Sequence, residues 1–580
     1  MKRIVLLVLV FAFMHMAHSQ NHDTQLLEKQ FENSDLYFQR YYLNTFALNN
    51  LSTVAPGFFS DTFMRLSLNP AFGLADTSRN YKFYLDYQSN RAEQVPRVFF
   101  SNFYGIPNQP PYINLNPCWY RISRSEPMPF FSVGFSGRIS SRLQLTTAYQ
   151  LIYKEEPFYR QPIYFYGLET FDDHFAQDNS PPVIFYRQRR NNTLTRAHLL
   201  ATYLSYQINA HLWAGIGVDV VLHKRDAHYL NLSSDHLNRN ELASESKDRG
   251  LTYNHHDISA GLVWLANPKW QFGIQAGRLN GRAKQNEVSL DSSIYGSHYS
   301  GHRQALHFDH DGNRYYSTVT LRFSPHARQT VFAFFHYSLL HNNLRNYANI
   351  HENDVSICQN QSGLQNNRSE STATLFNIYS DDGSLNENHF ESMFSLRVAQ
   401  NNRTVMRIGF YFSYLTGEKK ISEPVRFDYC WRYLNQNDTN YYERISRHKE
   451  DKMIYWHYRY TKQSVQMPVY VRHKINDNLA LFAIINKVWT AWRTNEKTDA
   501  FYREWYNLYN GNESIKQNFI KRYRLQPDDN QTKDSADLAL GFDVRPVHNI
   551  FIRYLINPDF GNNTRISQWE LSIYLNLSKG

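Results

Sequence analysis

Apolar and polar residues alternate along most of the chain after residue 80, and the alternating runs come in pairs. In the first pair, residues 131–139 lead through a turn at Ser140-Ser141-Arg142 into residues 143–153. Two such runs joined by a tight turn predict a β-hairpin with one apolar and one polar face. A side-chain period of two fits a strand and does not fit a helix.

Six more hairpins follow the same plan, and single runs precede and follow the whole set. We expect the other turns near 209–211, 267–269, 324–326, 401–402, 476–478 and 546–548, and the single runs at 81–87 and 569–577. Seven hairpins and two single strands predict sixteen strands, and fourteen is the alternative count.

The connections between these runs fall into two classes. Turns within hairpins are short, whereas long polar stretches lie between hairpins, near 89–128, 154–194, 225–253, 279–313, 341–388, 416–463 and 489–533. This sorting is typical of an outer-membrane barrel with short periplasmic turns and long extracellular loops. Lipid offers no partner to an open strand edge, so the sheet must close. We therefore predict an all-β chain whose residues 80–580 form a transmembrane antiparallel β-barrel in the cell outer membrane.

The composition agrees with strands that have one apolar face. The mean hydropathy of −0.59 is too low for a bundle of membrane-spanning helices. The chain nevertheless has 42 Tyr, 39 Phe and 10 Trp, which is too many rings for a disordered segment. Rings at the ends of the predicted strands fit anchoring at the two membrane–water interfaces, although ordinary sheet packing also favours them.

The first nineteen residues read as a secretory signal peptide. Lys2 and Arg3 precede an apolar run at 4–13, and small residues follow at 17–19. Without these two cations the chain has 60 basic and 52 acidic residues, a net charge of +8. That modest, dispersed surplus, on an exported chain, does not indicate nucleic-acid binding.

Neither the cysteines nor the usual catalytic motifs indicate chemistry. Cys118, Cys358 and Cys430 are far apart and form no C-x-x-C, so one disulfide in any of three pairings and three free thiols both stay open. The chain has no G-x-S-x-G, H-E-x-x-H or phosphate-binding Gly loop. We expect no enzymatic activity and no cofactor.

Two polar segments are weaker candidates for binding. One groups His298, His302, His307, Asp309, His310 and Asp311, which could ligate a metal, but a hydrophilic loop in a chain with 24 His is the favoured interpretation, and we expect no metal site. The other holds Arg187, Arg189 and Arg190, and then Arg444, Arg447, Lys449 and Lys452. These cations could pair with lipopolysaccharide phosphates or form ordinary solvated loops.

Residues 20–79 precede the first strand and are rich in apolar side chains. Phe58, Phe59 and Phe63 would be costly to leave in water, so we expect this segment to fill the lumen as a plug. It ends in Asn69-Pro70-Ala71, followed by small and apolar residues. This element resembles the N-P-A element of the FadL family of outer-membrane transporters, and other barrels of the Bacteroidota type carry a similar one.

The resemblance implies a lumen closed by an N-terminal hatch that includes Asn69, Pro70 and Ala71. It also implies passive passage of a hydrophobic or amphipathic solute through a lateral opening. The chain departs from the family, which usually has fourteen strands. The alternative is a non-enzymatic subunit or scaffold of an outer-membrane secretion or uptake complex, with its loops as partner surface.

Overall fold

The computed structural model describes most of the predicted barrel and parts of the segment before it. The described residues are 38–40, 57–58, 62–75, 81–89, 129–157, 184–187, 192–234, 242–295, 298–359, 365–378, 383–437, 441–523, 529–547, 549–559 and 565–577. The predicted signal peptide, most of 20–79, Cys118 and the stretch 90–128 lie outside them.

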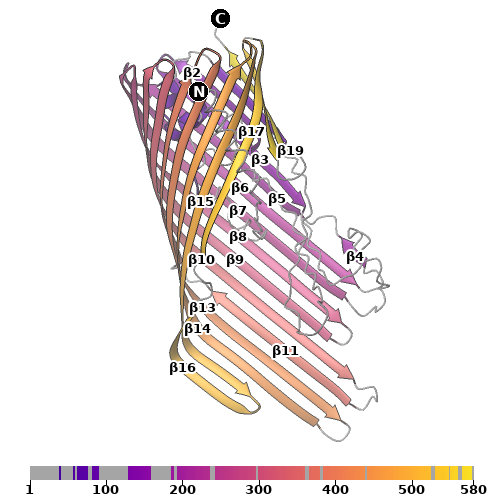
Figure 1. The fold of residues 1–580 in the computed structure, drawn as a ribbon. Coiled ribbons are helices and arrows are strands. Elements are labelled where there is room, and N and C mark those ends of the chain that lie inside the picture. Colours follow the sequence, from indigo (N-terminus) through magenta and orange to yellow (C-terminus); the bar gives the residue numbers. More distant parts are fainter. Residues whose placement is uncertain are drawn as a thin grey trace.

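A closed ring of antiparallel strands forms the body of the molecule (Figure 1). Strand β1 (Tyr81–Ser89) pairs with β2 (Pro129–Ser140) on one side and with β19 (Arg565–Leu577) on the other, which closes the ring. The strands between are β3 (Leu143–Pro157), β5 (Asn192–Gln207), β6 (Leu212–Ser234), β7 (Leu242–Asn267), β8 (Trp270–Tyr295), β9 (His298–His326), β10 (Gln329–Gln359), β12 (Gly383–Ala399), β13 (Thr404–Asn437), β14 (Tyr441–Lys474), β15 (Leu479–Tyr509), β17 (Asp529–Val547) and β18 (Ile550–Asp559). The ring therefore has sixteen strands, which confirms the prediction.

Three further strands widen the sheet beyond the ring. They are β4 (Ile184–Arg187) beside β6, β11 (Gln365–Ile378) between β10 and β13, and β16 (Asn512–Tyr523) beside β15. Figure 1 shows β11 and β16 far from the end of the barrel where the short turns lie.

The prediction of long extracellular loops is wrong for most of the described stretches. The described residues of 279–313 belong to β8 and β9, and those of 416–463 belong to β13 and β14. β13 and β14 have 34 residues each and stay in one register from Thr404↔His473 to Gln436↔Tyr441. The backbone hydrogen-bond ladder continues beyond the point where the apolar alternation stops. The alternation stops because the outer face of the sheet is polar there.

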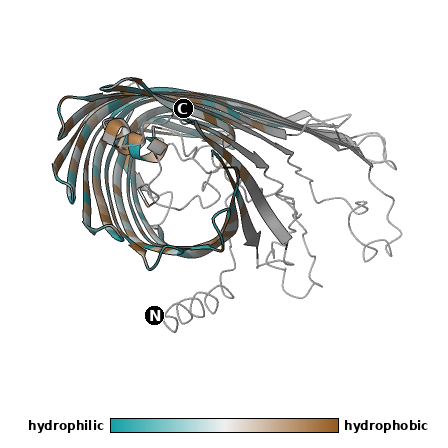
Figure 2. Ribbon diagram, turned by 90° about the horizontal axis from the view of Figure 1, so that it is seen from above, coloured by the Kyte–Doolittle hydropathy of each residue, from teal (hydrophilic) through white to brown (hydrophobic). Residues whose placement is uncertain are grey.

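The outside of the ring carries an apolar band. Ile216, Val218, Ile258, Leu262 and Ile274 point outward and are 41–59% exposed. Their neighbours in sequence, among them Asp257, Ser259 and Gln275, point inward and are buried. Figure 2 shows these alternating hydropathy bands around the ring.

The described part of the N-terminal segment lies inside this ring (Figure 2). It contains two short helices, α3 (Thr62–Leu68) and α4 (Phe72–Ala75). Phe58, Phe63 and Phe72 are each less than 5% exposed and pack against inward-facing side chains of the strands. No helix in the described ranges is long and apolar enough to cross a membrane.

Candidate functional site in the barrel interior

The element Asn69-Pro70-Ala71 forms the turn between α3 and α4. Asn69 N donates to Arg65 O at 2.9 Å, which is the last helical hydrogen bond of α3. The ring of Pro70 cannot continue the helix. Asn69 Oδ1 accepts a hydrogen bond from Ala71 N at 3.0 Å, and Asn69 O accepts one from Phe72 N at 3.0 Å. Hydrogen bonds within the turn therefore stabilise its conformation independently of the wall.

The side chain of Asn69 joins this turn to two strands of the wall. Its Nδ2 donates to Leu262 O on β7 at 3.0 Å and to Ile274 O on β8 at 2.9 Å. Leu262 and Ile274 are direct cross-strand partners. The neighbouring carbonyl of Pro70 accepts a hydrogen bond of 2.5 Å from Ser205 Oγ on β5.

Three glycines of the wall make this approach possible. A Cβ on Gly215 would overlap the backbone of Pro70 and Ala71, and one on Gly261 would overlap the amide of Asn69. A Cβ on Gly273 would stand 3.1 Å from Asn69 Nδ2. We call Gly215, Gly261 and Gly273 the glycine window. Sequence reasoning missed it, although the three glycines occupy inward positions in three consecutive predicted strands.

The outside of the wall is hollow at the same place. Three alanines line it together with larger apolar side chains: Ala214, Ala260, Ala276, Leu204, Tyr206, Ile216, Leu262 and Ile274. The hollow has a volume of about 480 Å³. The wall therefore has glycine on its inner face and alanine on its outer face where the turn touches it.

A second attachment joins the N-terminal segment to β9. Arg314 Nε donates to Phe38 O at 2.7 Å, and Phe38 N donates to Tyr253 Oη at 2.7 Å. The other guanidinium nitrogens of Arg314 reach Ser338 Oγ at 2.9 Å and Glu387 Oε2 at 2.7 Å. Arg314 is only 2% exposed. Burying its charge would be costly without this complete set of partners.

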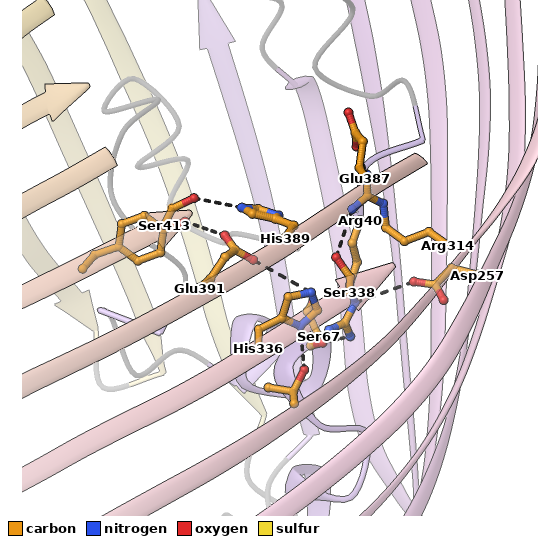
Figure 3. Close-up of polar contacts among 12 residues, drawn as sticks. Arg40, Ser67, Asp257, Arg314, His336, Ser338, Glu387, His389, Glu391 and Ser413 are labelled. Carbon is orange, nitrogen blue, oxygen red and sulfur yellow. Dashed lines mark hydrogen bonds and ion pairs between the residues drawn. The ribbon is translucent and has the colours of Figure 1, made fainter. Parts of the chain in front are cut away.

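Arg40 makes a third attachment from the N-terminal segment (Figure 3). Its Nε lies 3.7 Å from Asp257 Oδ2, and its guanidinium lies 4.2 Å from the centre of the Tyr316 ring. The hydroxyl of Tyr316 donates to Asp257 Oδ1 at 2.7 Å. Arg40 also donates to the carbonyl of Ser67. One cation thus links two parts of the segment and one acidic side chain of β7.

The wall supplies a fourth attachment at Phe58. Arg407 on β13 donates to Phe58 O, and the Phe58 ring packs in a buried cluster with Phe334, Tyr411 and Phe482. All four attachments use inward-facing side chains or backbone groups of the strands, so a single alternation pattern positions them.

A polar layer lies beside Arg314 on β10, β12 and β13 (Figure 3). His336 Nδ1 is 2.9 Å from Thr318 Oγ1, and its Nε2 is 3.9 Å from Glu391 Oε2. His389 Nε2 is 2.8 Å from Ser413 Oγ. This layer lines the interior next to the Phe58 cluster.

The candidate metal ligands of 298–311 are not brought together. They lie along β9, where alternation directs Asp309 and His310 to opposite faces. Asp309 accepts hydrogen bonds from Arg282 at 2.9 and 2.5 Å, and Asp311 accepts one from Asn343 at 3.1 Å. No group of three or more His, Cys, Asp or Glu in the described part of the chain could hold a metal ion.

The basic segment 444–452 is part of β14 and not a loop. Arg447 and Lys449 lie on one face, where Asp428 pairs with both at 2.7 and 3.7 Å. Lys452 lies on the other face and pairs with Glu450 at 2.5 Å. Cys430, on β13, is a free thiol.

Comparisons with known proteins find similarity among solved structures alone. No protein-family model and no curated protein matches the chain. A FadL homologue of Pseudomonas aeruginosa has a TM-score of 0.36 at 10% identity, covering 93% of this chain and all of the other. The toluene transporter TodX of Pseudomonas putida has 0.30 at 11% identity, covering 80% and 94%. The toluene transporter TbuX of Ralstonia pickettii has 0.26 at 11%, covering 64% and 93%.

Proposed function

We propose that this protein is an outer-membrane channel that passes hydrophobic or amphipathic small molecules passively, with residues 20–79 as its plug. The observation that carries the proposal is the turn Asn69-Pro70-Ala71 seated on the glycine window. It places an N-terminal element against a part of the wall that has glycine on its inner face, opposite an apolar hollow.

The outer membrane is the environment that suits such a wall. Side chains such as Ile258 and Ile274 are more than half exposed on the outside of a closed ring. Burying them in hydrocarbon is favourable by about 25 cal/mol per Å² of apolar surface. The ring also leaves no strand edge unpaired, which lipid requires.

A plug suits the size of this barrel. Barrels of 16–18 strands leave an aqueous channel when nothing fills them. Here Phe58 and Phe63 fill part of the interior, and Arg314, Arg407 and Asn69 tie the segment to the wall. In this proposal Asn69, Pro70 and Ala71 act as hatch residues, and the solute leaves or enters through the wall beside them.

Planar-bilayer recordings test the plug. The chain lacking residues 20–79 should conduct ions better than the intact protein, because the lumen is then unfilled. Uptake of an apolar fluorescent solute into proteoliposomes tests the transport. Equal conductance of the two proteins would refute the plug, and uptake no faster than in protein-free liposomes would refute the transport.

A scaffold subunit of a secretion or uptake complex is the second candidate. The observation that favours it is the sheet beyond the apolar band, where β13 and β14 continue with a polar outer face for much of their 34 residues. Such a surface can hold a protein partner. Affinity purification in mild detergent distinguishes the two, since a stoichiometric partner protein supports the scaffold.

A further inference from the structure

We propose that the inner face of the extended β13–β16 sheet binds an acidic oligosaccharide chain from outside the cell. This inference goes beyond transport and does not depend on it. The surface in question is the aromatic strip, which we define as the rings of Tyr460, Trp492, Tyr502, Trp505, Tyr509 and Phe519.

The strip continues the face that lines the barrel. In β13 and β14 the register never shifts, so Tyr460 lies on the same face as the buried Tyr470. The hydroxyl of Tyr460 donates to Glu387, which also pairs with Arg314 inside the barrel. A single bulge in β15 after Tyr502 leaves Tyr502 and Trp505 on one face.

Two stacked ring pairs lie along the strip. Tyr460 and Trp492 stack with centroids 5.5 Å apart and planes 10° apart, and Phe519 stacks at 4.6 Å and 4° on Tyr502, which is only 5% exposed. The rings that remain accessible to a ligand are those of Tyr460, Trp492, Trp505 and Tyr509. Aromatic faces carry negative potential and attract the weakly positive C–H groups of a flat, polar ring such as a pyranose.

Each part of the strip also holds a cation beside a ring. Lys462 lies 6.0 Å from Trp492, Lys516 lies 5.3 Å from Trp505, and Arg444 lies 5.1 Å from Tyr509. Arg444 Nε and the neighbouring Ser446 Oγ are buried and have no hydrogen-bond partner among the described residues. Such donors are expensive to bury unpaired, and an anionic ligand would satisfy them.

The opposite face of the same sheet has a different charge arrangement. There the carboxylates pair with the cations: Glu418 with Arg459 at 2.9 Å, Asp428 with Arg447 at 2.7 Å, and Glu443 with Arg432 at 2.5 Å. On the inner face, Glu450 pairs with Lys452. The inner face therefore offers cations and rings together, which fits a ligand that is anionic and has apolar ring faces.

The length of the strip favours a polymer. Arg444 and Tyr460 are separated by sixteen residues of one strand, which corresponds to about 50 Å. The strip faces the barrel axis, so sugars anchored in the surrounding membrane would meet the opposite face first. The expected ligand is thus an acidic glycan from the medium.

Binding to the intact protein in detergent micelles tests the proposal. Oligogalacturonate is the probe, maltoheptaose is the neutral comparison, and oligothymidylate represents nucleic acid. Calorimetry and tryptophan fluorescence report the binding. Trp505→Ala removes a ring on which a sugar can stack, and Lys516→Gln removes a cation that can pair with a carboxylate. Each should weaken oligogalacturonate binding at least about fivefold.

Matched controls lie on the opposite face of the same strands. Tyr455→Ala and Lys497→Gln remove an exposed ring and an exposed cation there, and they should change the affinity less than about twofold. The proposal is overturned if oligogalacturonate does not bind, if maltoheptaose binds equally well, or if the control variants lose as much affinity. Tighter binding of oligothymidylate would assign the strip to nucleic acid instead. Heat-modified migration on a gel confirms that each variant has folded.

Discussion

Arg314 on β9 donates a hydrogen bond of 2.7 Å to the carbonyl oxygen of Phe38, 276 residues earlier in the chain. The same guanidinium pairs with Glu387 of β12. One buried cation therefore holds the N-terminal segment and two strands together, and its removal should affect both the closed state and the fold.

We expect Arg314→Met to open the interior and to destabilise the barrel. The substitution leaves Glu387 buried without its cation, which costs about 3–5 kcal/mol when one partner of a buried pair is removed. Urea unfolding and planar-bilayer conductance measure the two effects. Arg278→Met is the control, because Arg278 is exposed on the outside and bonds to Asn313 at 2.8 Å. Equal effects of both variants would contradict the role given to Arg314.

Gly261→Ala should displace the turn at Asn69-Pro70-Ala71. A Cβ at residue 261 overlaps the Asn69 amide, so the turn must move from the wall. We expect higher conductance and faster uptake of an apolar solute. Gly250→Ala is a control in the same strand, where the nearest neighbour of the new Cβ, Asp226 Oδ1, stands 3.5 Å away. Unchanged conductance of Gly261→Ala would show that the contact does not hold the segment in place.

Asn69→Asp should weaken the same contact by different means. It replaces an amide donor with an acceptor that faces the carbonyl oxygens of Leu262 and Ile274. Losing a buried partner costs about 1–3 kcal/mol for each polar group left unsatisfied. Single-channel recordings should show more frequent opening. Asn209→Asp should be silent, because there the side-chain oxygen already accepts from His211 N at 2.8 Å.

Acid should lower the stability of the sheet around Glu418, which lies beyond the apolar band. Hydrogen bonds from Lys420, His457 and Arg459 lower the pKa of Glu418 to about 2. A carboxyl whose pKa is lower in the folded state contributes stability above its unfolded pKa of about 4.3, and this contribution is lost as the pH falls through about 2.

Amide hydrogen exchange of β13 and β14 measures this loss of stability. Protection near Glu418 should fall between about pH 4 and pH 2 in the native protein, and Glu418→Gln should remove that dependence. Glu504→Gln, at an exposed position of β15, is the charge-matched control. A pH dependence that survives Glu418→Gln would locate the effect at another carboxyl group.

Period-two alternation predicted the strands only where their two faces differ. It located hairpins such as 131–153 and a total of sixteen ring strands. It failed along 416–463, because Glu418, Lys420 and Arg432 on the outer face resemble a loop as much as a strand in water. The turn expected at 324–326 lies at 327–328, and Pro325 belongs to β9.

The candidate site was predicted in part. The sequence pointed to Asn69, Pro70 and Ala71 and to a buried N-terminal segment, but Arg40, Arg314, Arg407 and the glycine window were not singled out. Each of these is an ordinary residue in its own strand or segment. Its role comes from a neighbour far away in the chain, as Gly215 and Ala71 illustrate.

The amino-acid sequence by itself determined an antiparallel barrel, because alternation and short turns are local properties that each hairpin carries within a few residues. Only the tertiary structure decided what the interior holds. The folded sheet brings β5, β7 and β8 around the turn at Asn69-Pro70-Ala71 and brings Arg314 of β9 to Phe38, so these contacts exist only in the assembled barrel. Contacts between distant residues depend on strand register and curvature, and no local pattern records them.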